Sequence, residues 1–469
     1  MKYEGLKDLI ASWKGIVNNQ GEIIDSTGFY QLLYPLVYTS VFHPDPEVIN
    51  ACQWLIWEGA RSMGLYPASI QKLYEAKGRG ECLGTTVPAI NLRGLTYHAA
   101  RAVIRAAKRN RSGNFIFEIA RSEIEYTHQS PAEYATVVMA VALQEGYQGP
   151  LFIQGDHFQI DAQAYQEDRE TELKKVKELI REAVRAGFYN IDIDASTLVD
   201  LTKPNLSEQQ RPNFEVTALL AAFIREIQPE GITISIGGEI GEIGGKNSTE
   251  EELRAYLDGL RNELENISPN LTGLSKVSVQ TGTTHGGVVL PNGSVASVKL
   301  DFDTLRRLSH VAKEEYALAG AVQHGASTLP AEAFHHFPGT DTAEVHLATE
   351  FQNMIYDDHG FPPELKEEIY AYLKKECASE WKEGQTEEQF IYKTRKKGFG
   401  PFKKQIWDLP LSIREGISQR LEEKFHFLFH ELRATDTYDM VRERITPVYV
   451  AKPMPEGLKG LMEEIDVGT

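Results

Sequence analysis

Eight short apolar segments, separated by longer amphipathic ones, dominate the middle of this sequence. The segments cover residues 85–92, 114–120, 149–156, 188–196, 231–239, 275–282, 319–326 and 343–350. The stretches between them have helical patterns, as in ETELKKVKELIREAVRAG at 170–187. Strands that alternate with helices predict a parallel sheet, and eight is the number of such units that closes into a barrel. We therefore predict a (β/α)8 barrel of the TIM type.

Helical patterns continue on both sides of the predicted barrel. PEVINACQWLIWEGARSMGL at 46–65 places apolar residues three and four positions apart, which is typical of one helix face. The chain has 469 residues, more than the roughly 250 of a barrel of this kind. We predict an N-terminal helical extension over 1–82, the barrel over 83–360 and a C-terminal helical extension over 361–469.

Charge and composition argue against several classes of partner. The formal net charge of −18 disfavours nucleic acid and anionic membranes. The first residues, MKYEGLKDLIASWKG, do not form a signal peptide, and no segment approaches the roughly 18 apolar residues of a membrane span. The three cysteines lack the spacing of a disulfide framework or a metal motif. We expect a cytoplasmic protein without nucleic-acid or membrane partners.

Polar residues gather where the last six predicted strands end. In chain order they are Asp156 and His157; Asp192, Asp194 and Ser196; Glu239 and Glu242; Thr281, Thr283, Thr284 and His285; His324 and Ser327; His346 and Thr349. Barrels of this type carry their chemistry at the carboxyl ends of the strands. We therefore expect these side chains to surround one site.

Histidines from three different strand ends suggest a metal ion. His157, His285 and His324 could bind zinc and leave one position open for a substrate. The alternative is that each histidine is an ordinary core or loop residue. Asp156 could orient the site or act as a general base, or it could be a hydrogen-bond partner of a ligand histidine.

Four motifs at these positions resemble those of the class II, zinc-dependent ketose-bisphosphate aldolases, the fructose- and tagatose-bisphosphate aldolase family. The resemblance covers roughly residues 83–360. The motifs are QGDHF at 154–158, where the family has HxDH, GGEIGEIGG at 237–245, GTTHGG at 282–287 and HGAST at 324–328. The resemblance implies an aldolase that makes or breaks the C3–C4 bond of a ketose bisphosphate.

The resemblance also implies roles for individual residues. His157, His285 and His324 would bind Zn²⁺ or another divalent metal ion, and Glu239 would lie beside that metal as a family carboxylate. Asp156 would move the proton of the C4 hydroxyl.

The same resemblance assigns substrate contacts. Gly286, Gly325, Ser327 and Thr349 would hold a phosphate or hydroxyl groups of a sugar or sugar phosphate. His346 stands where the family has an asparagine that touches the enediolate. It could be a fourth metal ligand, a replacement for that contact or an inward-facing barrel residue.

Other departures from the family pattern affect phosphate binding and proton transfer at C3. Gln154 replaces the first histidine of HxDH, and Val288 and Val289 stand where the family has a phosphate-anchoring lysine. Asn247 and Ser248 replace the carboxylates of GGxED. These changes leave the C3–C4 cleavage apparatus in place. A 4-epimerase that cleaves the ketose, turns the aldehyde over and rejoins it is therefore an alternative, and a non-catalytic partner subunit of a tagatose-bisphosphate aldolase is another.

One basic segment stands out in this acidic chain. YKTRKKGFGPFKKQ at 392–405 interleaves lysines with aromatic residues. It could contact an acidic neighbouring subunit or stay solvated, or Lys396 and Lys397 could reach over the barrel mouth and supply the missing phosphate cation. The helical extensions suit a homo-oligomer.

Overall fold

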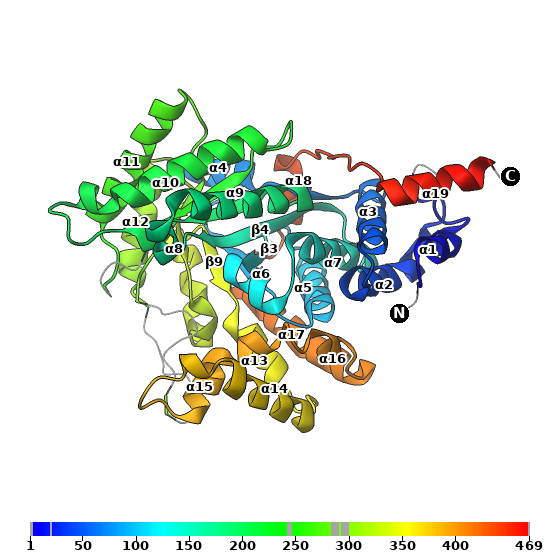
Figure 1. The fold of residues 1–469 in the computed structure, drawn as a ribbon. Coiled ribbons are helices and arrows are strands. Elements are labelled where there is room, and N and C mark those ends of the chain that lie inside the picture. The colour runs from blue at the N-terminus through cyan, green and yellow to red at the C-terminus, as the bar shows by residue number, and fades with distance from the viewer. Residues whose placement is uncertain (1–2, 19–20, 242–245, 283–289, 292–299, 468–469) are drawn as a thin grey trace.

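The computed structural model describes residues 3–18, 21–241, 246–282, 290–291 and 300–467. Eight parallel strands form a closed barrel surrounded by helices (Figure 1). The strands are β2 (Val87–Asn91), β3 (Ile116–Ala120), β4 (Gly149–Gln159), β5 (Asn190–Asp194), β6 (Ser235–Glu239), β7 (Lys276–Val279), β8 (Ala321–Gln323) and β9 (Glu344–Leu347). Seven lie within predicted segments and β4 extends its segment, 149–156, to Gln159. The predicted (β/α)8 fold is therefore confirmed.

A ninth strand, β1 (Leu65–Ala68), lies outside the barrel order and corrects the helical prediction for this part of the chain. It pairs with the first residues of β4, from Gly149 to Phe152. The later part of β4 pairs with β5 along the same edge. Asn190 joins the three strands, because its side-chain amide donates to the carbonyl oxygens of Ala68 and Ile153.

Helices precede, surround and follow the barrel. Before it come α1 (Leu6–Trp13), α2 (Ser26–Phe42), α3 (Pro46–Ser62) and α4 (Gln71–Gly78). Around it lie α5 (Thr96–Asn110), α6 (Arg121–Thr127), α7 (Pro131–Gln144), α8 (Ala162–Glu167), α9 (Arg169–Ala186), α10 (Leu206–Ile227), α11 (Glu250–Ile267), α12 (Phe302–Glu314) and α13 (Thr349–Tyr356). After it come α14 (Pro363–Glu376), α15 (Glu387–Thr394), the 3-10 turn η6 (Arg395–Gly398), α16 (Lys403–Trp407), α17 (Leu411–Glu431), α18 (Tyr438–Arg444) and α19 (Glu456–Val467).

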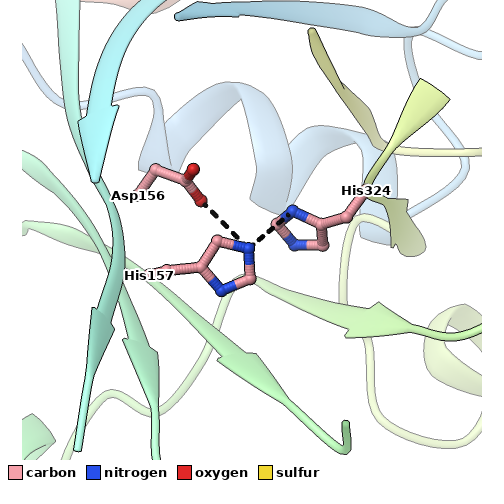
Figure 2. Close-up of side chains that lie close together, drawn as sticks. All are labelled: Asp156, His157 and His324. Carbon is pink, nitrogen blue, oxygen red and sulfur yellow. Dashed lines mark hydrogen bonds and ion pairs between the residues drawn. The ribbon is translucent and has the colours of Figure 1, made fainter. Parts of the chain in front are cut away.

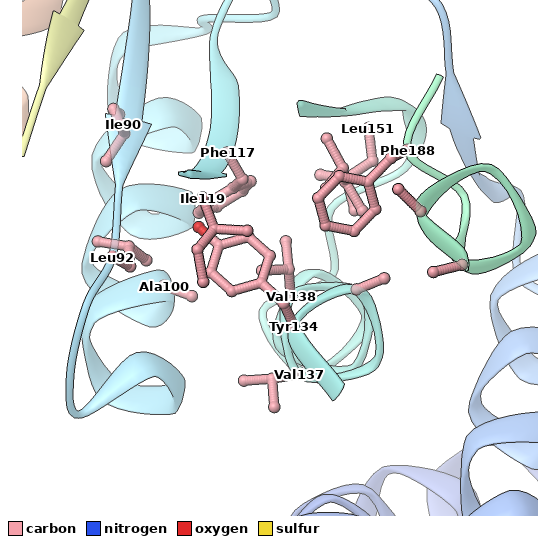
Figure 3. Close-up of a cluster of buried hydrophobic side chains, with 14 of the residues drawn as sticks. Ile90, Leu92, Ala100, Phe117, Ile119, Tyr134, Val137, Val138, Leu151 and Phe188 are labelled. Carbon is pink, nitrogen blue, oxygen red and sulfur yellow. The ribbon is translucent and has the colours of Figure 1, made fainter. Parts of the chain in front are cut away.

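Toward their carboxyl ends, the strands place apolar side chains outward and polar ones inward, whereas Ala89, Ile116 and Phe152 form a separate apolar cluster nearer the strand starts. In β3, Phe117 and Ile119 pack among buried residues of α5 and α7, including Ala100 and Tyr134 (Figure 3). Glu118 stands between them in the sequence and therefore points to the opposite face, into the barrel. This alternation buries an apolar layer under the helices and leaves polar groups inside the barrel near the carboxyl ends of the strands.

The helices outside the barrel pack on it at several places, with α18 against α4 and β4. Helices α2 and α3 pack against α7, and α17 packs along α5. The turn η6 lies against α6, so a segment far along the chain reaches the mouth of the barrel. None of the helices in the described part of the chain combines the length and apolar composition that a bilayer crossing needs.

Candidate active site

A buried charge network fills the barrel beneath the strand ends. Lys276 of β7 is 1% exposed and donates to Asp192 at 2.9 Å and to Glu344 at 2.5 Å. Burial alone would lower the pKa of Lys276, but the two carboxylates hold it above its usual value. Burial raises the pKa of Asp192 to about 6, although the charge of Lys276 opposes that shift. The network gives the site a fixed polar floor.

Gln154 belongs to this floor, which accounts for the first departure from the HxDH motif. Its side-chain oxygen accepts from Lys276 at 2.8 Å, and its amide donates to Glu344 at 2.7 Å and to Glu118 at 3.1 Å. A glutamine offers a donor and an acceptor at once, so it can join a cation and two carboxylates. In this chain the position therefore serves the buried network.

Asp156 lies above the floor and is held by His346. The Nδ1 atom of His346 is 3.1 Å from Asp156 Oδ1 and 3.1 Å from Glu118 Oε2. Burial would lower the pKa of His346, but the carboxylates of Glu118 and Asp156 raise it well above the usual range. Burial raises the pKa of Glu118 to about 8. The structure thus places His346 as an inward-facing residue that bridges two acids.

His157 and His324 approach each other beside Asp156 (Figure 2). His157 Nε2 lies 2.9 Å from His324 Nδ1 and 3.6 Å from Asp156 Oδ1. The backbone of His157 has a φ of +40°, and the pairing of β4 with β5 is irregular between Gly155 and Phe158. A bulge re-aims side chains, and it allows the consecutive residues Asp156 and His157 to face the same site.

Carboxylates hold the other side of the His157 ring. Its Nδ1 atom lies 3.0 Å from Glu239 Oε2 and 3.1 Å from Asp194 Oδ2. Glu239 therefore lies behind His157, on the side away from His324. A histidine that donates one ring nitrogen to a carboxylate presents the other as an oriented ligand. His324 is fixed similarly, with Nε2 2.8 Å from Ser278 Oγ.

These groups fit a divalent metal ion. His157, His324 and Asp156 each offer a ligand atom, and the three atoms lie within 4.8 Å of one another. Imidazole nitrogens and carboxylate oxygens are the usual protein ligands of zinc alongside cysteine. The third predicted ligand, His285, lies outside the described residues, as does Gly286.

A pocket of about 580 Å³ opens above the site. Asp156, His157 and His324 line it, together with His346 and the remaining described residues of the predicted substrate set. These last are Gly325, Ser327 and Thr349. The hydroxyl of Ser327 accepts a hydrogen bond from the Thr349 backbone N–H at 3.1 Å, which joins the loops after β8 and β9.

Sequence reasoning overlooked several groups at this site. Arg93 and Glu118 line the pocket, and Lys276 lies beneath it. Arg93 stands in NLRG at the end of a predicted strand, so the rule that selected the other polar residues could have selected it. Lys396 of the basic segment also lines the pocket, whereas Lys397 contacts Glu380 instead.

Comparison with known proteins agrees with this architecture. The family model of class-II fructose-bisphosphate aldolases matches residues 76–407. A subunit of D-tagatose-1,6-bisphosphate aldolase, GatZ of Escherichia coli O1:K1, is 24% identical over 284 residues, which are 58% of this chain and 65% of the relative. GatZ of the O6:H1 strain CFT073 is 30% identical over 156 residues, 31% of this chain and 37% of the relative. The chain thus covers less than two thirds of these relatives.

A solved structure shares the fold. The fructuronate-tagaturonate epimerase UxaE of Cohnella laeviribosi, in a glycerol complex, superposes with a TM-score of 0.57 at 11% identity, covering 85% of this chain and 90% of that one. Because the family model spans well over half of the sequence, membership does not depend on this likeness. The chain belongs to the class-II fructose-bisphosphate aldolase family.

Proposed function

We propose that this protein makes and breaks the C3–C4 bond of a ketose or ketose phosphate, as an aldolase. The observation that carries the proposal is the meeting of Asp156, His157 and His324 at strand ends that open into one pocket. A proton acceptor and a cation site side by side are what an aldol cleavage needs.

We propose that His157 and His324 hold a divalent metal ion, with His285 as a third ligand. Zinc suits a site with imidazole ligands and an open position, and other divalent ions accept the same ligand types. A bound ion would polarise the carbonyl of the substrate. Glu239 and Asp194 then act through His157 by fixing its ring from behind.

Asp156 is the proposed general base. In the cleavage direction it takes the proton of the C4 hydroxyl, and that oxygen becomes the carbonyl oxygen of the departing aldehyde. The electron pair of the C3–C4 bond stays with C3 and is delocalised toward the C2 carbonyl. His346 bridges Asp156 to Glu118 and so fixes the acceptor oxygen. Gly325, Ser327 and Thr349 would contact the phosphate or hydroxyl groups of the substrate.

A 4-epimerase is the second candidate. It uses the same cleavage but keeps both fragments, rotates the aldehyde and rejoins them. Two observations favour it. The family's phosphate-anchoring lysine and GGxED carboxylates are replaced in this sequence, and the fructuronate-tagaturonate epimerase UxaE has this fold.

The test is incubation of the zinc-loaded protein with fructose, fructose 6-phosphate and fructose 1,6-bisphosphate, with products identified by NMR. Three-carbon products from the bisphosphate would support the aldolase. A tagatose-type sugar without released fragments would support the epimerase, and solvent deuterium at C3 of that product would contradict a closed cycle. No conversion of any ketose would contradict both, as expected of a partner subunit.

Asp156→Asn should abolish either reaction, because an amide cannot accept the hydroxyl proton. Asp303→Asn is the matched control, since that carboxylate is 81% exposed on α12. Equal activity in the two variants would remove Asp156 from the mechanism.

A further inference from the structure

Two cations enter the pocket from parts of the chain outside the histidine cluster. Arg93 follows β2, and Lys396 belongs to the turn η6 after the barrel. They lie more than 300 residues apart in the sequence. Their meeting at one pocket is therefore a product of the fold.

The side chain of Arg93 is held in place by hydrogen bonds from its Nε and Nη1 atoms, while its Nη2 atom remains available as a donor. Its Nε donates to Glu123 at 2.7 Å, and its Nη1 donates to Gln352 at 2.9 Å and lies 3.4 Å from Thr349 Oγ1. Among the described residues, none accepts a hydrogen bond from its Nη2. Arginine commonly binds phosphate or carboxylate groups through such a planar fork.

Lys396 is a half-buried ammonium without an acidic partner. In the described part of the chain its amino group forms no hydrogen bond or ion pair, and it lies 5.4 Å from the centre of the Tyr126 ring. Burial lowers the pKa of Lys396, and the charge of Arg93 acts in the same direction against weaker opposition from Glu123 and Glu380. A partly buried ammonium beside another cation loses its proton more readily, and a bound anion would stabilise its charged form.

The segment that carries Lys396 is fixed to the barrel. Arg395 forms a two-pronged ion pair with Asp357, at 2.8 and 3.0 Å. Gly94, directly after Arg93, packs so closely on Phe399 that an added Cβ would lie 2.1 Å from that ring. The position of Lys396 is therefore set by packing, and its ammonium group is held at the pocket.

We infer that Arg93 and Lys396 together bind an anionic group of the substrate, either a phosphate or a carboxylate. Among the described residues, Glu123 is the one carboxylate in direct contact with either cation, whereas Asp156 and Glu380 act on them from farther away. A bound anion would therefore complete the site. It would supply acceptors for the free Nη2 of Arg93 and for the ammonium of Lys396. The two cations would thereby take the place of the phosphate-anchoring lysine that the sequence lacks. That the anion belongs to a ketose rests on the proposed function; the anion site itself does not.

The experiment measures binding without turnover. Metal-loaded Asp156→Asn protein is titrated calorimetrically with fructose 6-phosphate, fructuronate and fructose. The same titrations are made on two double variants, in which the Asp156→Asn protein also carries Lys396→Met or the control substitution Lys397→Met. Lys397 is the control because it contacts Glu380. Methionine preserves the apolar stem, and Lys396→Gln is the substitute if the first variant does not fold.

Lys396→Met should weaken binding of an anionic ketose about tenfold or more relative to Lys397→Met, because hydrogen bonds to charged groups are strong. A loss confined to fructose 6-phosphate identifies a phosphate site, and a loss confined to fructuronate identifies a carboxylate site. Equal affinities in the two variants, or no binding of either anion by the parent, would overturn the inference. Failure of the wild-type protein to convert any ketose would instead refute the proposed function.

Discussion

Replacing Lys276 by methionine should destabilise the protein by about 3 kcal/mol. Breaking a buried ion pair by removing one partner costs roughly 3–5 kcal/mol, because the remaining charge stays buried. Lys276 is 1% exposed and forms ion pairs with both Asp192 and Glu344. Glu344 would keep His346, 2.6 Å away, and the amide of Gln154, so we expect the lower end of the range.

Urea unfolding followed by tryptophan fluorescence and circular dichroism measures this loss, through a lower midpoint at unchanged slope. Lys375→Met is the control, because that lysine side chain is 83% exposed and should contribute little. Adding Glu344→Gln to Lys276→Met should recover part of the loss, since one fewer carboxylate is left unpaired. A loss below about 1 kcal/mol in the single variant would refute our account of the charge network.

Three further predictions concern the pocket. Zn²⁺ at about a hundredfold excess over its dissociation constant should stabilise the protein by roughly 2.7 kcal/mol. Calorimetry of the His324→Ala variant should show that most of this stabilisation is lost. Full stabilisation of the variant would remove His324 from the metal site. Affinity for an anionic ketose should fall as pH rises, at a pH below the ordinary lysine pKa of about 10.4, because Lys396 loses its proton early. Titrations of Lys396→Arg should lack this fall, and identical profiles in the two proteins would contradict the role of Lys396. Gly94→Ala should cost about 1–3 kcal/mol in urea unfolding and weaken anion binding by pushing Phe399 away, whereas unchanged values would show that the segment is not held there.

The barrel could be predicted from the sequence because parallel strands are buried on both faces and read as short apolar runs. The same logic located Asp156, His157 and His324, since strand ends meet at one edge of the barrel. It failed for β1, the four residues LYPA, because a segment this short has no pattern of its own and becomes a strand by pairing with distant residues of β4.

The charge network and the inward position of Lys396 were harder to foresee for a related reason. Lys276 lies inside an apolar run, and its carboxylate partners come from two other strands, so nothing local marks it as paired. The basic segment was visible, but its composition cannot say which lysine turns inward. That choice follows from the ion pair of Arg395 and the contact of Phe399 with Gly94.

Because β1 and β5 pair with successive parts of the same edge of β4, β1 forms part of the barrel wall. β5 begins its pairing at Gln154, so on this edge only β1 covers β4 from Gly149 to Phe152, while β3 pairs with the opposite edge from Phe152 onward. A chain started after residue 70 would expose that stretch of backbone, and an uncovered strand edge tends to pair with other molecules. Attempts to produce the barrel alone, for crystallisation or engineering, should therefore keep residues 65–68 or expect aggregation.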